Sequence, residues 1–328
     1  AATAAAAVAE VGPDFGKLEQ RATELAALAE GFEDDVAEGH VRWIDLSPQQ
    51  ARLVESPLDI RELFAEQRKL QPKAWIFTSA TLGDDDKLGW FTQAAGLDDA
   101  TTLRVGSPFD YAAHARLWIP ARCPKPNEPG HPAAVGTIAA RLAAALNGRT
   151  FVLTTTLRVL PQVAEALRAQ AERRGADLRV LVQGSEPRRA LLQRYGDGRG
   201  AVLVGSQSFW EGIDMPGDAL QCVVIDKLPF PPPNDPLVEA RVKQLKSQGR
   251  DAFNDYFVAE AAIALKQGAG RLIRTETDKG LLVVCDVRLL QARYGARLLR
   301  ALPPMAELTS GEQALGWLRE LASERSLA

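Results

Sequence analysis

The sequence predicts an α/β fold built on a doubly wound parallel sheet, and two observations support that prediction. From residue 132 onward, short apolar runs alternate with longer segments of helical spacing, which is the pattern of parallel strands joined by crossover helices. The apolar runs also end in small or polar residues, as at Thr154-Thr-Thr156 and Gln183-Gly184. Because open α/β sheets bind ligands beyond the carboxyl ends of their strands, these residues mark a candidate ligand-binding edge.

Composition narrows the class of protein. The 328 residues are 46% hydrophobic and 25% charged, which is ordinary for a globular protein with one large domain or two smaller ones. No apolar run approaches the roughly 20 residues of a membrane span. The net charge of −3 excludes a global basic field, so a nucleic-acid site would have to be a local patch.

The three cysteines, Cys123, Cys222 and Cys285, stand far apart in the sequence. They form neither a CxxC pair nor a disulfide framework, and the last two lie inside apolar runs. We therefore expect reduced thiols, a cytoplasmic location, and no metal ion or iron–sulfur cluster held by this chain.

The first 70 residues are expected to be mainly helical. An apolar stripe predicts a helix over 16–32, and a second helix is expected over about 57–70. Between them, Val41-Arg-Trp-Ile-Asp-Leu46 is a strand candidate that Ser47-Pro48 ends.

The pattern changes after residue 73. Ala74-Trp-Ile-Phe77 is a short continuous apolar run, typical of a strand that is buried on both faces of a parallel sheet. A helix is expected over 85–95, and Arg116-Leu-Trp-Ile-Pro120 is expected to be extended. Five prolines between residues 120 and 132 indicate a linker between two domains.

The rest of the chain is regular. Asn147-Gly148 predicts the carboxyl-terminal cap of the first helix in this part. The expected helices cover about 132–146, 158–174, 187–195, 235–248, 252–274 and 289–301, and the expected strands cover 151–153, 178–182, 201–204, 220–225 and 280–285.

Two features of the strand ends leave alternatives open. Hydroxyl residues at these positions are also ordinary helix N-caps, so a purely structural role for each threonine of 154–156 remains possible. The segment Gly205 to Gly217 carries two carboxylates, Glu211 and Asp214, and the aromatic pair Phe209-Trp210. The position of this segment at a strand end favours contact with a nucleotide over glycosidase chemistry by the two acids. The structural alternatives are that the acids order the loop through hydrogen bonds and that the aromatic rings pack in the core.

The octapeptide Gln267-Gly-Ala-Gly-Arg-Leu-Ile-Arg274 follows a segment of helical spacing. If that helix continues, Gln267, Arg271 and Arg274 occupy positions i, i+4 and i+7 on one face. The small residues between them would allow a polyphosphate to approach, and arginine binds phosphate oxygens bidentately. The alternative is a basic turn on the surface of an amphipathic helix.

Several segments occur together in a fixed order: Phe77-Thr-Ser-Ala-Thr-Leu82, Ser107-Pro-Phe109, Phe209-Trp-Glu-Gly-Ile-Asp-Met-Pro-Gly217, Lys227-Leu-Pro-Phe-Pro-Pro-Pro233, the octapeptide, Asp286-Val-Arg288 and Tyr294-Gly295. This set resembles motifs III, V and VI and neighbouring segments of the XPD/DinG group of superfamily 2 DNA helicases, in particular the bacterial DinG/YoaA branch. The first 70 residues resemble, more loosely, the end of the helical arch insertion that precedes motif III. The resemblance implies that the sheet is RecA-like and is the second helicase motor lobe.

The resemblance also implies a function and its residues. The complete protein would be an ATP-dependent DNA helicase that translocates on single-stranded or forked DNA in repair or replication. Arg271 and Arg274 would be arginine fingers on the γ-phosphate, an interaction worth roughly 10³–10⁵ in rate in well-studied systems, and Gln267 would position the site.

The remaining implied roles concern the nucleotide, the coupling of hydrolysis to movement, and the DNA strand. Glu211, Gly212 and Asp214 would face the nucleotide through ribose or magnesium-bound water, and Ser79 and Thr81 would couple hydrolysis to strand movement. DNA phosphates would be held, without sequence preference, by Thr154, Thr155, Thr156, Gln183, Ser206 and Ser208.

The family motifs that this sequence lacks are those of the first motor lobe. It contains no GxxxxGK[ST] P-loop, no Asp-Glu-Ala-His-like box and no set of four clustered cysteines. We therefore expect the C-terminal half of such a helicase, which would share ATP and Mg²⁺ with its own N-terminal motor lobe. An iron–sulfur cluster would belong to that other half. Without the P-loop that cradles the phosphates, this part alone is expected neither to hydrolyse ATP nor to unwind DNA.

This interpretation sets the expected domain boundaries. Residues 1–70 would be a helical arch remnant, 71–118 the end of the first RecA-like lobe with motif III, 119–132 a Pro-rich linker, and 133–328 the second RecA-like lobe. A non-catalytic module that binds nucleic acid or a partner is the first alternative. A nicotinamide-type cofactor enzyme is disfavoured because no GxGxxG follows a strand.

The segment 313–321 near the end of the chain is amphipathic, with apolar residues at Leu315, Trp317, Leu318 and Leu321. An apolar helical stripe usually faces a core, so we expect this helix to pack on its own domain. Docking of a replication clamp-loader subunit is the alternative use of the stripe.

Overall fold

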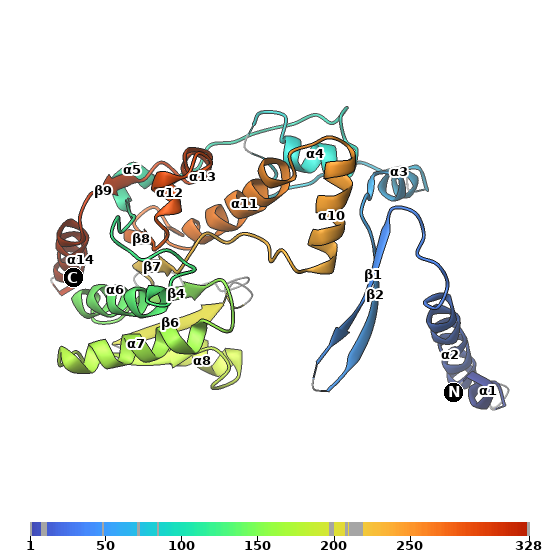
Figure 1. Ribbon diagram of the computed structural model, residues 1–328, viewed down its shortest axis with the longest axis horizontal. Helices are drawn as coiled ribbons and strands as arrows, with labels where there is room; N and C mark the ends of the chain where they lie inside the picture. The colour runs from blue at the N-terminus through green and yellow to red at the C-terminus, as the bar shows by residue number, and fades with distance from the viewer. Residues whose placement is uncertain are drawn as a thin grey trace. The chain divides into compact units, whose positions relative to one another are not determined.

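The computed structural model describes residues 2–7, 12–47, 49–70, 73–83, 85–196, 200–206, 209 and 219–326. The chain divides into two compact units (Figure 1). The first consists of residues 1–76, 91–100 and 232–251, and the second of residues 77–90, 101–231 and 252–328. None of the helices in these described ranges combines the length and the apolarity that crossing a bilayer would require.

The second unit is built on a seven-stranded sheet in which every described pairing is parallel. In spatial order the strands are β5 (Arg179–Val182), β6 (Ala201–Ser206), β4 (Thr150–Thr154), β7 (Cys222–Ile225), β8 (Gly280–Val284), β3 (Ala115–Trp118) and β9 (Ala306–Leu308). Because the strands run in one direction, their carboxyl ends share one edge of the sheet.

Helices cover both faces of this sheet, and the strand residues alternate between them (Figure 1). Phe151, Leu153 and Val223 face one cluster with α8 (Arg188–Gly196), α11 (Val258–Ala269), α12 (Arg288–Gln291) and α13 (Gly295–Ala301). Val152, Val202 and Val224 face the other with α6 (His131–Leu146), α7 (Leu160–Arg173) and α14 (Gly311–Ser326). The predicted doubly wound parallel sheet is confirmed.

Two details of this unit confirm the sequence analysis. Helix α6 ends where Asn147-Gly148 predicted its cap: Asn147 has φ 51° and Gly148 has φ 96°. A Cβ at Gly148 would lie 2.5 Å from the backbone nitrogen of Ala201, so glycine is required there for two reasons. The C-terminal amphipathic helix α14 packs on its own domain, because Leu315, Leu318 and Leu321 are buried in the second cluster.

The expected boundary between lobes is wrong for one strand. Strand β3 was placed at the end of the first lobe, but it pairs in parallel with β8 and with β9. The Pro-rich segment that follows, expected to be a linker, connects β3 to α6 and contributes buried Cys123 to the core. In this sheet the alternate residues Ala115 and Leu117 of β3 are buried.

Three other expectations also need correction. Residues 74–77 form no strand, and Ile76 is 83% exposed, because no described strand pairs with this segment. The helix expected over 252–274 is a π-helix, Phe253–Phe257, followed by α11, which ends at Ala269. The helix expected over 289–301 is the pair α12 and α13.

The first unit contains α1 (Ala2–Ala6), α2 (Pro13–Gly31), α3 (Arg61–Leu70), α10 (Pro236–Ser247) and most of α4 (Gly89–Ala95). It also contains an antiparallel hairpin of β1 (His40–Leu46) and β2 (Ala51–Pro57), whose register pairs Trp43 with Val54. The second strand was not predicted, so the expectation of mainly helical structure in residues 1–70 is only partly correct. Arg42 fixes the start of the hairpin through hydrogen bonds of 2.7 Å to the carbonyl oxygens of Phe32 and Asp34.

Candidate functional site

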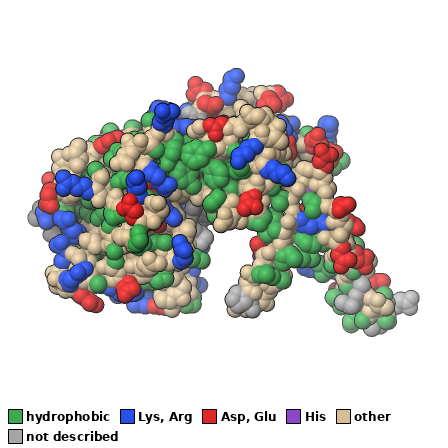
Figure 2. All heavy atoms as spheres, in the orientation of Figure 1, with side chains coloured by type: hydrophobic (Ala, Val, Ile, Leu, Met, Phe, Trp, Pro, Cys, Tyr) green, Lys and Arg blue, Asp and Glu red, His purple; other side chains and the backbone are tan. Residues whose placement is uncertain are grey.

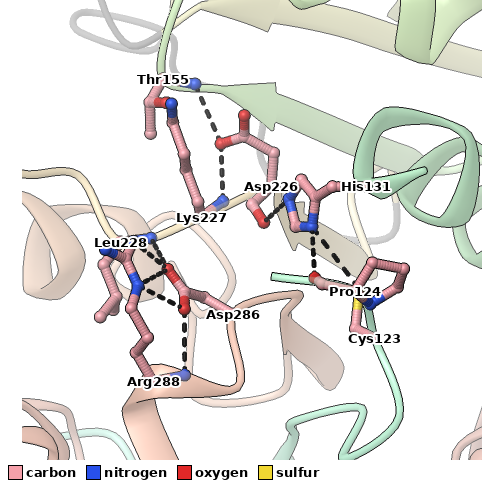
Figure 3. A network of polar contacts seen from close by, with 9 residues as sticks. All are labelled: Cys123, Pro124, His131, Thr155, Asp226, Lys227, Leu228, Asp286 and Arg288. Atoms are coloured by element: carbon pink, nitrogen blue, oxygen red, sulfur yellow. Dashed lines mark hydrogen bonds and ion pairs between the residues drawn. The ribbon is translucent and has the colours of Figure 1, made fainter. Parts of the chain in front are cut away.

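Asp226 directly follows β7, at the centre of the carboxyl edge of the sheet, and links the ends of two strands. One carboxylate oxygen, Oδ1, accepts hydrogen bonds from the backbone N–H of Thr155 at 3.0 Å and of Lys227 at 2.7 Å (Figure 3). Thr155 follows β4, the neighbour of β7. Asp226 therefore connects the loops that leave two adjacent strands.

Asp226 has no exposed surface, and its second oxygen, Oδ2, has no hydrogen-bond partner among the described residues. Burial raises the pKa of this carboxyl group to about 6, and the two N–H donors and the nearby charge of Lys227 oppose that rise. The hydroxyl oxygen of Thr155 is likewise buried without a partner in the described part of the chain. Two unsatisfied polar atoms thus lie at the same strand ends.

His131, the first residue of α6, connects the segment before that helix to the same strand end. Its Nδ1 lies 2.8 Å from the carbonyl oxygen of Pro124, and its Nε2 lies 3.0 Å from the carbonyl oxygen of Asp226 (Figure 3). The Cys123 sulfur is 3.9 Å from Nδ1. The side chain is 2% exposed, so it is a structural connector and not a surface group.

Asp286, which follows β8, organises a second network. Its carboxylate accepts hydrogen bonds from the side chain of Arg288 at 2.6 to 3.2 Å and from the Leu228 N–H at 2.9 Å (Figure 3). The guanidinium carbon of Arg288 lies 5.7 Å from the ring centroid of Phe230, whose ring meets Tyr294 edge to face. Residues of three separate sequence motifs are therefore brought into one network.

The structure distinguishes among the threonines expected to bind DNA. Thr154 is 1% exposed, and its hydroxyl donates to the carbonyl oxygens of Thr156 and Gly205 at 3.2 and 3.5 Å. Thr154 therefore has an internal structural role, but not the helix-capping role left open for these threonines, because its hydroxyl donates to carbonyl oxygens and the N-cap of α7 is Val159. Thr156 is the residue of the three whose side chain is exposed.

Gln183 and Ser206 are brought together at the neighbouring strand ends. The side-chain oxygen of Gln183 accepts the Ser206 backbone N–H at 2.6 Å, and Ser206 is 5% exposed. Gln183 thus ties β5 to β6, and its oxygen is already occupied. Other predicted residues of this loop, Glu211, Gly212, Asp214 and Ser208, lie outside the described residues.

Ser79 and Thr81, the expected coupling residues, lie in an exposed turn. Their hydroxyl oxygens are 3.2 Å apart, and the Thr81 N–H donates to the Ser79 oxygen at 3.2 Å. This local arrangement orders the turn by itself.

The predicted arginine helix is wrong in its geometry. Helix α11 ends at Ala269, so Arg271 and Arg274 lie in a turn, residues 270–274, which we call the arginine turn. Gln267 is exposed on the last helical turn. Leu272 and Ile273 are each 1% exposed while Arg271 and Arg274 are partly exposed. The helical bonding pattern stops here, because the N–H groups of Arg271 and Leu272 donate to the carbonyl oxygens of Gly268 and Ala269, three and not four residues back.

Two neighbours lie next to Arg274. Asp278 accepts the Arg274 backbone N–H at 2.7 Å. Burial raises the pKa of Tyr111, while its hydrogen bond with Ser107 and the positive charge of Arg274 act in the opposite direction. The charge of Arg274 is therefore near enough to Tyr111 to influence the ionisation of its hydroxyl.

Sequence reasoning missed Asp278 and the roles of His131, Asp226 and Asp286. The sequence does carry a signal for Asp226 and Asp286, because each follows a continuous apolar run that forms a buried strand. The role of Asp278 depends on how the loop folds back, which its sequence does not show.

No single charge sign covers the face shown in Figure 2, where basic and acidic side chains are interspersed. This distribution agrees with the net charge of −3. Any anionic ligand on that face would meet local groups of arginine and lysine and not a continuous basic surface.

Comparison with known proteins identifies related sequences. The family described as helicase C-terminal domain matches residues 139–305, just over half of the chain. The ATP-dependent DNA helicase YoaA of Escherichia coli is 39% identical over 285 residues, which cover 87% of this chain and 44% of that protein. The ATP-dependent helicase DinG of Mycobacterium tuberculosis is 35% identical over 310 residues, which cover 91% and 45% respectively. The chain thus spans less than half the length of these relatives.

Among solved structures, an XPD helicase matches with a TM-score of 0.58 over 90% of this chain and 50% of that chain, at 15% sequence identity. At this identity the likeness shows the fold alone, and it confirms the RecA-like sheet. The family match, which covers just over half of the chain, shows that the chain belongs to the helicase C-terminal domain family.

Proposed function

We propose that this chain is the second motor lobe of an ATP-dependent DNA helicase that moves along single-stranded or forked DNA. The observation that supports the proposal most directly is the arginine turn. Two guanidiniums, Arg271 and Arg274, flank two fully buried anchors, Leu272 and Ile273. The turn therefore presents two permanent positive charges from a fixed backbone, which is what stabilising charge on a transferring phosphoryl group requires.

The residues present fit one side of an ATP site. Arg271 and Arg274 would contact the γ-phosphate, and Gln267, exposed one turn earlier, would line the approach. No group of three or more His, Cys, Asp or Glu side chains that could hold a metal ion occurs within the described residues. Magnesium and the phosphate cradle would therefore be supplied by a first motor lobe with a P-loop, together with Glu211, Gly212 and Asp214 from this chain.

The DNA strand would cross the carboxyl edge of the sheet between β4 and β7. After β4 the chain continues to α7 on one face, and after β7 it reaches α11 on the other face. Ligands of open α/β sheets bind where neighbouring connections diverge in this way. The side chains of Thr156 and Lys227 would contact phosphate, with Ser79 and Thr81 coupling hydrolysis to movement.

The partners and the location follow from the same proposal. The obligatory partner is the first motor lobe, and the three free buried cysteines suit the reducing cytoplasm. A clamp-loader subunit would have to use a surface other than the apolar stripe of α14, because Leu315, Leu318 and Leu321 of that stripe are buried.

The decisive experiment measures ATP hydrolysis, with and without single-stranded DNA, by the complete protein, meaning this chain with any coding sequence that precedes residue 1. Arg271→Ala and Arg274→Ala should each reduce DNA-stimulated kcat by about 10³-fold or more. Arg300→Ala is the matched control, since Arg300 is exposed on α13. Wild-type hydrolysis by both arginine-turn variants would overturn the proposal.

The isolated chain provides a second measurement. We expect it to hydrolyse no ATP, because the P-loop cradle is absent. If the complete protein also binds single-stranded DNA without any ATPase activity, the non-catalytic binding module becomes the better description.

A further inference from the structure

Asp278 holds the arginine turn through both of its carboxylate oxygens. Oδ2 accepts the backbone N–H groups of Arg274 at 2.7 Å and of Thr275 at 2.8 Å, and Oδ1 accepts the Thr275 hydroxyl at 2.7 Å. The N–H of Asp278 donates in return to the Thr275 carbonyl oxygen at 3.3 Å. The carboxylate is in a residue that is only 6% exposed, so water competes little for these hydrogen bonds.

The other end of the arginine turn is held by the helix that precedes it. The N–H groups of Arg271 and Leu272 donate to the carbonyl oxygens of Gly268 and Ala269, each at 3.1 Å. These bonds satisfy carbonyls that the end of α11 would otherwise leave without partners. The backbone of the turn is thus bonded to α11 on one side and to Asp278 on the other.

We propose that Asp278 is a positioning residue for Arg274 in ATP hydrolysis, an inference that rests on the proposed function. The two hydrogen bonds that Asp278 accepts come from the N–H groups of Arg274 and Thr275, one on each side of the Arg274 α-carbon. They set the direction in which the Arg274 side chain leaves the backbone. An arginine on a transferring phosphate contributes through preorganised geometry, and a displacement of about 1 Å can cost about 100-fold in rate. Asp278 itself does not touch the nucleotide and acts through Arg274.

A purely structural role for Asp278 makes a different prediction. In that case its loss would lower the melting temperature but leave the catalytic constants of the folded protein unchanged. The positioning role requires a fall in kcat at a nearly constant KM for ATP, because Arg274 would then act in the transition state and not in ground-state binding.

The test compares four variants of the complete protein. Asp278→Ala removes all three acceptor bonds, and Asp278→Asn keeps an oxygen for the two N–H groups. Thr275→Val removes the hydroxyl bond with little change of shape. Glu276→Ala is the control, since Glu276 is an exposed acid two residues away. DNA-stimulated kcat, KM for ATP and thermal unfolding are measured for each.

We expect Asp278→Ala to lower kcat by about 10- to 100-fold with KM changed less than about threefold, Asp278→Asn to recover most of the rate, and Glu276→Ala to match the wild type. The affinity for ADP with aluminium fluoride, which mimics the transferring phosphate, should fall in Asp278→Ala while the affinity for ADP does not. Folded Asp278→Ala with wild-type kcat, alongside an impaired Arg274→Ala, would overturn the positioning role and leave the proposed function intact. Wild-type rates in Arg271→Ala and Arg274→Ala would instead overturn the function itself.

If Asp278→Ala does not fold, Thr275→Val decides the matter. A severalfold loss of kcat at unchanged KM supports the positioning role, because one of the bonds that orient the Asp278 carboxylate is missing. Unchanged kcat in folded Thr275→Val would overturn it.

Discussion

Each ring nitrogen of His131 lies within hydrogen-bond distance of a carbonyl oxygen: Nδ1 is 2.8 Å from that of Pro124, and Nε2 is 3.0 Å from that of Asp226. A carbonyl oxygen accepts but cannot donate, so a neutral imidazole with one N–H can satisfy only one of its two neighbours. The doubly protonated ring satisfies both. Burial lowers the pKa of His131, but the Cys123 and carbonyl contacts outweigh it, and the pKa is raised above 6.5.

The first prediction concerns this ring. A raised folded pKa means that the stabilisation by His131 is fully present below its unfolded pKa, near 6.5, and is lost as pH rises through the folded value. An NMR titration of the ring, assigned with His131→Asn, should give a midpoint above 6.5. Cys123→Ala should lower that midpoint, and Cys222→Ala, which changes a buried thiol elsewhere, should not. A midpoint at or below 6.5 in the wild type would contradict the assignment.

The second prediction concerns Asp226, whose pKa burial raises to about 6 from 3.8. Between these values the folded state binds more protons than the unfolded state, so stability falls as pH rises through this window, by about 3 kcal/mol. Asp226→Asn keeps an oxygen for the N–H groups of Thr155 and Lys227 but never ionises. Its free energy of unfolding relative to the wild type should therefore increase from pH 4.5 to pH 7.5, as measured by urea unfolding. Equal differences at the two pH values would show that ionisation of Asp226 has no such cost.

The third prediction has the opposite sign. Burial alone would raise the pKa of Asp286, but the hydrogen bonds from Arg288 and the Leu228 N–H outweigh it, and the pKa is lowered from 3.8. The stabilisation is then present above the unfolded pKa and is lost as pH falls through the lower folded value. Asp286→Asn should cost about 1.5–3 kcal/mol at pH 7, and the cost should shrink below pH 4. Asp226→Asn serves as the control, because its effect on stability should change with pH in the opposite direction. A general effect of pH on unfolding would instead change both variants in the same direction.

Much of the sheet could be predicted because its central strands are buried on both faces. Runs such as 280–285 are continuously apolar, and local sequence is enough to identify them. Strand β2 was missed because its residues are mostly exposed, so no apolar alternation marks it. The apolar run 74–77 shows the opposite error, a predicted strand that does not form. An apolar run becomes a strand only when another strand pairs with it.

The geometry of the candidate site could not be predicted from the sequence. The motif points to Arg271 and Arg274, but the end of α11 at Ala269 was not predicted, because the apolar pattern continues past that residue through buried Leu272 and Ile273. The bonds of Asp278 and of Asp226 join residues whose approach depends on loop paths and strand order, which spacing along the chain does not reveal.

The fourth prediction concerns the packing of α6 against α7. A Cβ at Gly136 would lie 2.7 Å from the Ala166 Cβ, 2.7 Å from the Val163 carbonyl oxygen and 2.8 Å from the Leu167 nitrogen. Two of these atoms are backbone, so the helices would have to separate. Overpacking of this kind costs about 1–3 kcal/mol, which exceeds the gain in helix propensity of about 1 kcal/mol from replacing glycine by alanine.

Gly316→Ala provides the matched control, because a Cβ at Gly316 in α14 would meet nothing within 4 Å. That substitution should stabilise the protein by up to about 1 kcal/mol through helix propensity alone. Urea unfolding of the two variants should therefore give free-energy changes of opposite sign. If Gly136→Ala were as stable as Gly316→Ala, the close approach of α6 and α7 at Gly136 would be refuted, and the glycine would have to be explained by another cause.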